Sequence, residues 1–267
     1  MRIRLNIRTD EPHGNVIPVN YSYPLSAWIY RTIASGNHEF AGFLHDSGFK
    51  TGLKQYKLFC FSQLQFPEKG FKVEGDRLSI LKGECRLEIS FMAPLALETF
   101  IAGLFRGQRF RIGDKLSAAG LRVESVEILP NPGFSGSMKF KCISPILVSK
   151  ERHDSRNAEY LSPEHNDFQK IFFDNLINKY TAALTHRLIG AMTANSEDDS
   201  AMLLKILNTP RSHLITIKAG TPHQTKIKGY TFDFEITAPQ PLIYTGYTAG
   251  FGEKNALGLG CVKIDGN

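Results

Sequence analysis

A glycine-rich stretch near the end of the chain contains the residues whose types and spacing point most directly to chemistry. Residues 250–260 spell GFGEKNALGLG, in which two G-φ-G elements with an apolar central residue are separated by five residues. Bare backbone lets a polyanion lie close to the chain, and Lys254 adds a positive charge. We therefore expect a phosphate-binding loop between two short strands, formed by Gly250, Gly252, Gly258 and Gly260. The alternative is a tight hairpin whose glycines only satisfy positive φ angles.

Two common nucleotide-binding motifs do not fit this stretch. It lacks the GxxxxGK[ST] spacing of a P-loop. A dinucleotide-binding fingerprint would open a βαβ unit, whereas only seven residues follow Gly260. A nucleotide cofactor is therefore not expected.

Two segments of the chain are rich in positive charge. The net charge is +6, which is modest, but residues 104–122 carry five basic residues against one acid, and residues 211–228 carry four basic residues and no acid. The basic residues are Arg106, Arg109, Arg111, Lys115 and Arg122 in the first segment, and Arg211, Lys218, Lys226 and Lys228 in the second. These segments could form a surface that follows a phosphate backbone. They could equally be the solvated faces of strands and loops.

Metal sites and disulfides are not expected. The four cysteines, at positions 60, 85, 142 and 261, form no C-x-x-C pair and lie at no zinc-ligand spacing from a histidine. Three of them fall in apolar or alternating runs, so we interpret all four as reduced and mostly buried thiols. The sequence thus predicts no metal and no cofactor.

Composition favours a folded protein without a membrane span. Apolar residues make up 42% of the 267 residues, and no apolar run reaches about eighteen residues. The start, MRIRLNIRTD, alternates charged and aliphatic residues, which is typical of a strand rather than a signal peptide. We expect a cytoplasmic protein that does not insert into a membrane.

The first half of the chain predicts a β-α-β-β-α-β unit. Residues 2–8 alternate as a half-buried strand with a basic face, and residues 24–35 have helical spacing of apolar residues. A second short helix follows from residue 38. Further strands are expected at 57–62, 77–81, 85–92 and 121–129, with a helix at 94–107. This order is that of the ferredoxin-like arrangement.

The second half repeats this plan less clearly. Residues 130–137 (PNPGFSGS) form a turn-rich linker. Strands are expected at 138–144, 213–220, 226–239 and 261–264, with helices at 165–184 and 198–207. We therefore predict an α+β protein made of two tandem ferredoxin-like (RRM-like) domains, residues 1–130 and 138–267, the second ending in the glycine-rich loop.

These features together resemble the RAMP superfamily of CRISPR systems. The chain is most similar to the CRISPR-associated endoribonuclease that cuts repeat RNA into guide RNA units. The resemblance extends over the whole length and is strongest in MRIRLNI, in LSAWIYRTI, FLHDSGF and YKLFCFS of the first unit, and in the glycine loop. It implies that the glycine loop and Lys254 bind RNA. Whether other effector subunits bind, and whether the chain is a monomer or a homodimer, stay open.

The resemblance also implies a metal-independent cleavage. In that family the 2′-hydroxyl of the RNA attacks the adjacent phosphorus, which gives a 2′,3′-cyclic phosphate and a 5′-hydroxyl. The family pattern is a tyrosine in the first helix, a histidine in the next short helix and a lysine before the following strand. These positions correspond to Tyr30, His45 and Lys57 here. Histidine can exchange protons near neutral pH, and lysine or tyrosine can stabilise developing charge.

Two assignments within this set have competitors. His38 precedes His45 by seven residues, so both would face the same side of a continuous helix. The segment between His45 and Lys57 is longer than in the archaeal members of the family, so Lys50 or Lys54 could replace Lys57. Tyr30 could be a core aromatic, and His45 a surface residue near a helix end.

Two other functions compete with cleavage. Many RAMP proteins only bind guide RNA within an effector complex, and some relatives of the nuclease have lost the histidine. The chain could also be a two-domain scaffold whose basic charge is incidental.

Overall fold

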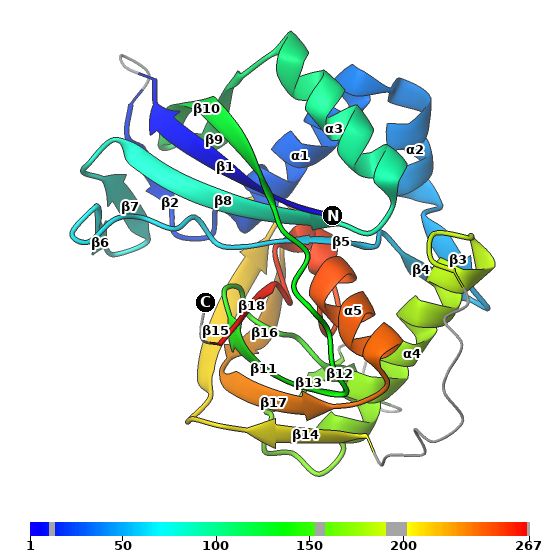
Figure 1. The fold of residues 1–267 in the computed structure, drawn as a ribbon. Coiled ribbons are helices and arrows are strands. Elements are labelled where there is room, and N and C mark those ends of the chain that lie inside the picture. The colour runs from blue at the N-terminus through cyan, green and yellow to red at the C-terminus, as the bar shows by residue number, and fades with distance from the viewer. Residues whose placement is uncertain (11–13, 153–157, 191–201, 266–267) are drawn as a thin grey trace.

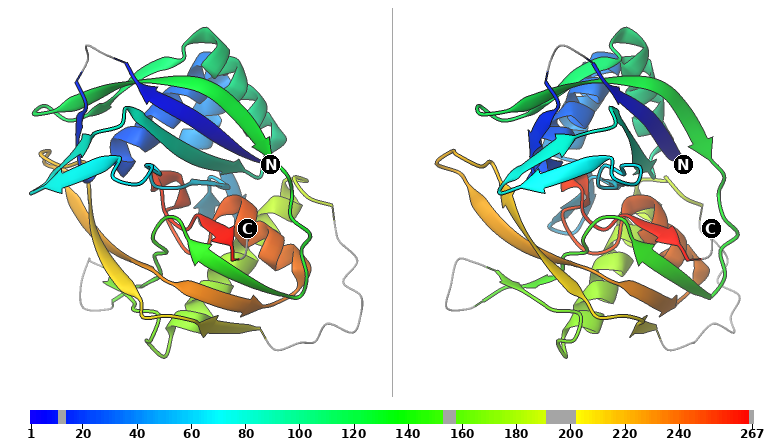
Figure 2. Two further views of the ribbon diagram at one scale, coloured as in Figure 1. Left: turned by 60° about the vertical axis from the view of Figure 1, so that its left-hand side comes forward. Right: turned by 90° about the vertical axis from the view of Figure 1, so that its left-hand side faces the viewer.

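The structure is a computed structural model in which residues 1–10, 14–152, 158–190 and 202–265 are described (Figure 1). Each half of the chain forms an antiparallel sheet with helices packed against it, so the fold class is α+β, as predicted. Figures 1 and 2 show the two halves stacked, with β5 (Phe59–Phe61) and the helix α5 (Gln240–Ala249) between them. None of the helices within the described ranges is both long and apolar enough to span a bilayer.

The first sheet is built around the N-terminal strand β1 (Arg2–Thr9). Its strands follow the order β5-β8-β1-β10-β9, and β1 pairs antiparallel with both neighbours. The other strands are β8 (Glu84–Phe91), β10 (Ala118–Leu129) and the edge strand β9 (Arg109–Gly113). The alternation in β1 places Ile3, Leu5 and Ile7 in the core, as predicted.

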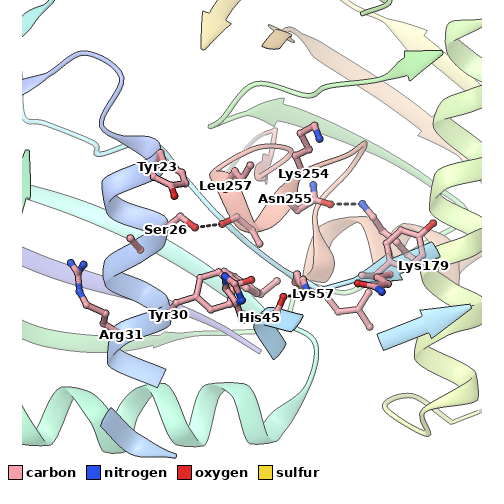
Figure 3. Close-up of a pocket in the computed structure, with 16 residues that line it drawn as sticks. Tyr23, Ser26, Tyr30, Arg31, His45, Lys57, Lys179, Lys254, Asn255 and Leu257 are labelled. Carbon is pink, nitrogen blue, oxygen red and sulfur yellow. Dashed lines mark hydrogen bonds between the residues drawn. The ribbon is translucent and has the colours of Figure 1, made fainter. Parts of the chain in front are cut away.

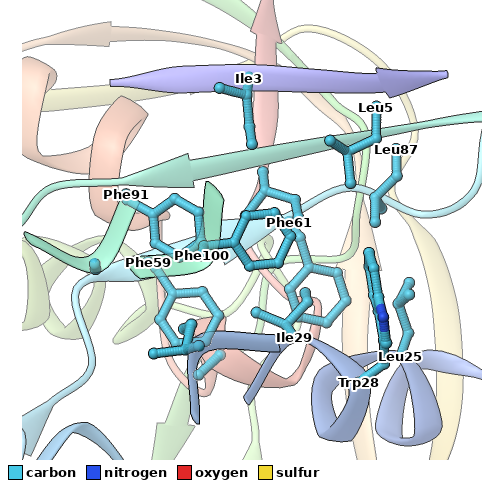
Figure 4. Packing of buried hydrophobic residues seen from close by; sticks show 14 of the residues in the cluster. Ile3, Leu5, Leu25, Trp28, Ile29, Phe59, Phe61, Leu87, Phe91 and Phe100 are labelled. Carbon is cyan, nitrogen blue, oxygen red and sulfur yellow. The ribbon is translucent and has the colours of Figure 1, made fainter. Parts of the chain in front are cut away.

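Three helices cover one face of this sheet (Figure 2). They are α1 (Ser22–Gly36), α2 (His38–Asp46) and α3 (Pro94–Arg106). Figure 4 shows the resulting core, in which Leu25, Trp28 and Ile29 of α1 face the apolar side chains of the sheet. The helices α1 and α3 cross very closely, because a Cβ at Gly103 would lie 1.8 Å from the carbonyl oxygen of Thr32. Only glycine permits this approach.

The first half also contains two small sheets, and the strand expected at 77–81 lies in one of them rather than in the main sheet. One has three strands in the order β2-β7-β6, and the other is a hairpin that precedes Lys57. The strands are β2 (Val16–Pro18), β6 (Phe71–Glu74) and β7 (Arg77–Ile80), and in the hairpin β3 (Phe49–Thr51) and β4 (Lys54–Tyr56). The strand predicted at 57–62 is shortened to β5, so Lys57 lies just before it.

The second sheet has the strand order β14-β17-β11-β18. Its strands are β14 (Leu203–Ile206), β17 (Asp233–Thr237), β11 (Ser137–Cys142) and β18 (Val262–Ile264). The helix α4 (Phe168–Thr185) and α5 contribute to its aromatic core. The remaining pairs are β12 (Ser149–Lys150) with β13 (Glu159–Tyr160), and β15 (Arg211–Ile217) with β16 (Thr225–Thr231).

The two sheets share one strand order. Each half contains a series of four strands and two helices in the chain order β-α-β-β-α-β. In both sheets these four strands lie side by side in the order second, third, first, fourth. In the first half β9 extends this order at the edge, and in the second half the β15–β16 hairpin is inserted between the second and third strands. The repeat that the sequence indicated only weakly is therefore present in the topology.

Two sequence predictions for the second half are wrong. Residues 203–206 of the helix predicted at 198–207 form β14, which pairs with β17, while residues 198–201 lie outside the described residues. The leucines of β14 favour a helix, but the segment forms a strand in which exposed and half-buried residues alternate. The glycine stretch also does not lie between two strands, since α5 precedes it and β18 follows. An apolar face with Leu242, Ile243 and Tyr247 supports that helix.

A buried arginine joins the two halves. The guanidinium of Arg2 donates to the carbonyl oxygens of Val262 at 2.6 Å and Tyr247 at 2.8 Å, and it lies 3.8 Å from the centre of the Tyr247 ring. The carboxylate of Glu88 lies 3.6 Å away. The basic face predicted for β1 is thus not uniformly solvated, because Arg2 is only 3% exposed.

Replacing Arg2 with methionine should lower the free energy of unfolding by about 3 kcal/mol, since it leaves buried acceptors unpaired. Urea unfolding followed by circular dichroism measures the change. The control is Arg8→Met on the same strand, whose exposed pair with Glu124 should contribute less than about 1 kcal/mol. Equal effects of the two substitutions would show that Arg2 does not hold the halves together.

Candidate active site

A cavity of about 530 Å³ lies where α1, α2, the start of β5 and the glycine loop meet (Figure 3). Both halves of the chain contribute to it. The residues that line it include Ser26, Tyr30, Arg31, His45, Lys57, Lys179, Lys254 and Asn255. Among the described residues, no aspartate or glutamate lines the cavity, while Arg31, Lys57 and Lys254 bring positive charge. Such a cavity suits an anionic ligand.

Tyr30 and His45 lie side by side in this cavity. Tyr30 is on the last half of α1, and its ring contacts the His45 ring edge-to-face at 5.5 Å and the Phe59 ring at 5.6 Å, both between centroids. Burial raises the pKa of Tyr30 above its usual value. The phenol therefore keeps its proton at neutral pH and can donate a hydrogen bond to an anionic oxygen.

His45 is oriented by its neighbour in the chain. Its Nδ1 lies 2.8 Å from a carboxylate oxygen of Asp46. Because an ionised carboxylate only accepts hydrogen bonds, Nδ1 carries the proton and Nε2 is left to exchange a proton with a ligand. The side chain is 72% exposed, so a ligand can reach it.

Lys57 is fixed near the end of α2. Its Nζ donates to the carbonyl oxygen of His45 at 2.6 Å, which satisfies one of the free carbonyls at the end of that helix. Burial lowers the pKa of Lys57, and the carboxylate of Asp46 partly opposes this change. Lys57 thus holds the His45 backbone and also brings a positive charge to the cavity.

The competing residues lie elsewhere. His38 opens α2, two turns from His45, and is exposed. Lys50 and Lys54 belong to the β3–β4 hairpin and are also exposed. None of the three lines the cavity. The structure therefore brings Tyr30, His45 and Lys57 together and leaves the alternatives outside.

The glycine loop folds against the protein itself. Gly250, Gly252, Gly258 and Gly260 are buried and have φ angles of +91°, +64°, +82° and +72°. Added Cβ atoms would lie 2.4 Å from the Leu147 carbonyl oxygen at Gly252, and 1.9 Å from that of Phe251 at Gly260. The glycines are therefore required by backbone conformation and by close packing. Lys254 is the exposed residue of the loop, and it faces the cavity.

A buried lysine that the sequence analysis missed holds this loop. The Nζ of Lys179, on α4, donates to the carbonyl oxygens of Gly250 and Gly252 and to Oδ1 of Asn255, the last at 2.6 Å (Figure 3). Burial lowers the pKa of Lys179 to about 7. The three acceptors favour the ammonium form, because a neutral amine has only two N–H bonds.

The position of Lys179 in its helix could have indicated from the sequence that this lysine is buried. It follows Phe172 and Leu176 on the apolar stripe of α4, where a charged residue is unusual unless it has a buried partner. Ser26 was missed as well, and it donates to the carbonyl oxygen of Ala256 at 2.6 Å, which ties α1 to the loop. No sequence motif marks this contact.

In the described parts of the chain, no three histidine, cysteine or acidic side chains are grouped as metal ligands. All four cysteines are free, and three of them are buried.

Known proteins resemble both halves of the chain. Residues 129–264 match the family described as CRISPR associated protein Cas6, C-terminal, and residues 16–118 match CRISPR-associated protein Cas6, N-terminal. The chain belongs to the Cas6 family.

Cas6 relatives resemble the chain along its whole length. CRISPR-associated endoribonuclease Cas6 1 of Methanocaldococcus jannaschii is 29% identical over 98% of this chain and 92% of its own. CRISPR-associated endoribonuclease Cas6 of Pyrococcus furiosus is 28% identical over 99% and 89%. A solved structure, described as the characterization of a Cas6-related gene from Pyrococcus furiosus, has a TM-score of 0.78 at 22% identity and covers 100% of this chain and 99% of its own. The Cas6 fold is therefore shared.

Replacing Gly260 with alanine should destabilise the protein by about 3 kcal/mol or more, because the new methyl group meets the Phe251 carbonyl oxygen. The matched control is Gly220→Ala. Gly220 has nearly the same φ, +71°, but no atom within 4 Å of the added Cβ, so it should lose only about 1–2 kcal/mol. Thermal unfolding of both variants separates packing from backbone strain. Similar losses would show that the loop is not tightly packed.

Proposed function

We propose that the chain is an endoribonuclease that cleaves CRISPR repeat RNA without a metal ion, at the cavity of Tyr30, His45 and Lys57. The observation that carries this proposal is the convergence of a proton-exchanging imidazole, a neutral phenol and a lysine in one cavity. Membership of the Cas6 family, with relatives named CRISPR-associated endoribonucleases, supports endoribonuclease activity.

In the proposed reaction the 2′-oxygen of the RNA attacks the adjacent phosphorus, and the bond from phosphorus to the 5′-oxygen breaks. The 2′-hydroxyl loses its proton and the leaving 5′-oxygen gains one. The products are a 2′,3′-cyclic phosphate and a 5′-hydroxyl. Nε2 of His45 makes one of these two proton transfers, since Nδ1 is held by Asp46.

Tyr30 and Lys57 would stabilise the negative charge that develops on the phosphorane. Tyr30 can donate because its raised pKa keeps the phenol protonated. Lys57 already donates one hydrogen bond to the His45 carbonyl oxygen, and its ammonium group has two further donors. No step of this scheme uses a metal ion or a cofactor.

We also propose that the glycine loop contributes to RNA binding through Lys254. Gly250, Gly252, Gly258 and Gly260 would act indirectly, because their buried, tightly packed backbone presents Lys254 at the cavity. The division into domains 1–130 and 138–267 fits this proposal, since the first would carry the catalytic residues and the second the loop.

The decisive test uses end-labelled repeat RNA from the source genome, incubated with the protein in EDTA. We expect cleavage that persists in EDTA and that is abolished by a single 2′-deoxy substitution at the cut nucleotide, because the attacking oxygen is then absent. Denaturing gel electrophoresis measures both. Tight binding without cleavage of the unmodified RNA would contradict catalysis and support a guide-RNA-binding subunit.

Replacing His45 with alanine should lower the single-turnover cleavage rate by roughly 10²–10⁴-fold, the usual contribution of a general acid or base. RNA affinity, measured by fluorescence anisotropy, should change little. The imidazole is exposed, and the arginine and lysine residues that line the same cavity remain in the variant. His38→Ala is the control on the same helix and should cleave normally. Loss of cleavage in His38→Ala alone would place the proton transfer at the other end of α2.

A further inference from the structure

A second basic recess lies on the far side of α1 from His45. It measures about 320 Å³ and is enclosed by α1, the end of α3 and the edge strand β9. Four arginines line it, Arg31, Arg106, Arg109 and Arg111, and none of the acidic residues that the structure describes is among its lining residues. Three of these belong to the basic segment that stands out in the sequence between residues 104 and 122.

Short connections bring these arginines together. Arg106 ends α3, and only Gly107 and Gln108 separate it from β9, which begins with Arg109. The close crossing of α1 and α3 at Gly103 then places Arg31 beside them. Phe110, between the two arginines of β9, stacks on Trp28 at 3.9 Å and anchors the strand against α1.

Most of this positive charge is not compensated within the protein. Arg109 pairs with Asp10 at 3.2 Å, and Arg106 donates to the carbonyl oxygen of Ser35. In the residues that the structure describes, neither Arg31 nor Arg111 forms an ion pair. Like charges gathered in one recess repel each other, and an anion bound there relieves the repulsion.

Arginine clusters suit one kind of anion in particular. The planar guanidinium offers paired N–H donors that match the oxygens of a phosphate group. Arg31 lines both this recess and the cavity of Tyr30 and His45, so the two adjoin across α1. In Figure 3 the Arg31 side chain leaves α1 on the side away from His45. A chain of phosphates can therefore pass from one to the other.

We propose that this arginine recess binds backbone phosphates of the RNA segment that flanks the cleaved bond on one side. The proposal rests on the proposed function, because it extends the path of the same RNA beyond the catalytic cavity. The recess adds affinity and fixes the direction of the strand, whereas bond cleavage depends on Tyr30, His45 and Lys57. Recognition of backbone phosphates alone carries no sequence information.

The test compares the full-length protein with the Arg106→Gln/Arg111→Gln variant. The probe is the source genome's repeat RNA with a 2′-deoxy at the cut nucleotide, and its dissociation constant is measured by anisotropy over a series of KCl concentrations. The matched control is Lys139→Gln/Lys205→Gln, which removes the same charge from the exposed faces of β11 and β14 in the second sheet.

Loss of two phosphate contacts should reduce the slope of log K against log salt by about 1.4 and weaken binding roughly tenfold near physiological salt. The control should keep the wild-type slope. Single-turnover cleavage of unmodified RNA at saturating protein should stay within about threefold of wild type, because neither arginine is placed at the reacting atoms.

Shortened RNAs locate the contact. Removing the nucleotides on one side of the cut should erase the difference between wild type and the arginine variant, and removing those on the other side should preserve it. A slope equal to that of the control pair would overturn the recess as an RNA site while cleavage by the wild type still upheld the nuclease. Absence of cleavage by the wild type would instead contradict the proposed function.

Discussion

The arrangement of the cavity depends on the contact between Lys179 and the glycine loop. One buried ammonium group on α4 satisfies two loop carbonyls and the amide oxygen of Asn255. A buried polar group without a partner is costly, so the loop has little freedom to leave this position. The glycines make the same conformation sterically possible. The Lys179 ammonium group and the positive φ angles of the glycines thus together favour one conformation of the loop.

The loop in turn links the two halves at the site. Its Ala256 carbonyl oxygen accepts from Ser26 on α1, one turn before Tyr30, while Arg2 joins β1 to Val262 just beyond the loop. Tyr30, His45 and Lys57 come from the first half, and Lys254 and Lys179 come from the second. The cavity therefore exists only where the two halves meet. The hydrogen bond from Ser26 connects the loop to α1, the helix that carries Tyr30.

Patterns of short range were predictable from the sequence, and contacts between distant segments were not. The period-two alternation of β1 and the apolar stripe of α1 each follow from local burial, so both elements were predicted. The strand β14 was missed because its pairing with β17, which is distant in sequence, decides its structure. The burial of Arg2 and the three acceptors of Lys179 are likewise set by tertiary packing. Tyr30, His45 and Lys57 were predicted from a family pattern, which carries such long-range information, and the structure places all three at one cavity.

The separation of binding from cleavage follows from where the charges lie. The imidazole, phenol and lysine that could handle protons and phosphorane charge are confined to one side of α1, whereas the arginines gather on the other side. Phosphate contacts act additively and weaken with salt, while proton transfer depends on the placement of a few atoms. The helix α1 carries both Tyr30 and Arg31, so the proposed sites of cleavage and of phosphate binding are neighbours. Their contributions to rate and to affinity depend on different groups. Successive residues of a helix lie about 100° apart, so Arg31 can leave α1 on the side away from His45 while Tyr30 contacts the His45 ring, and Arg31 still lines both spaces.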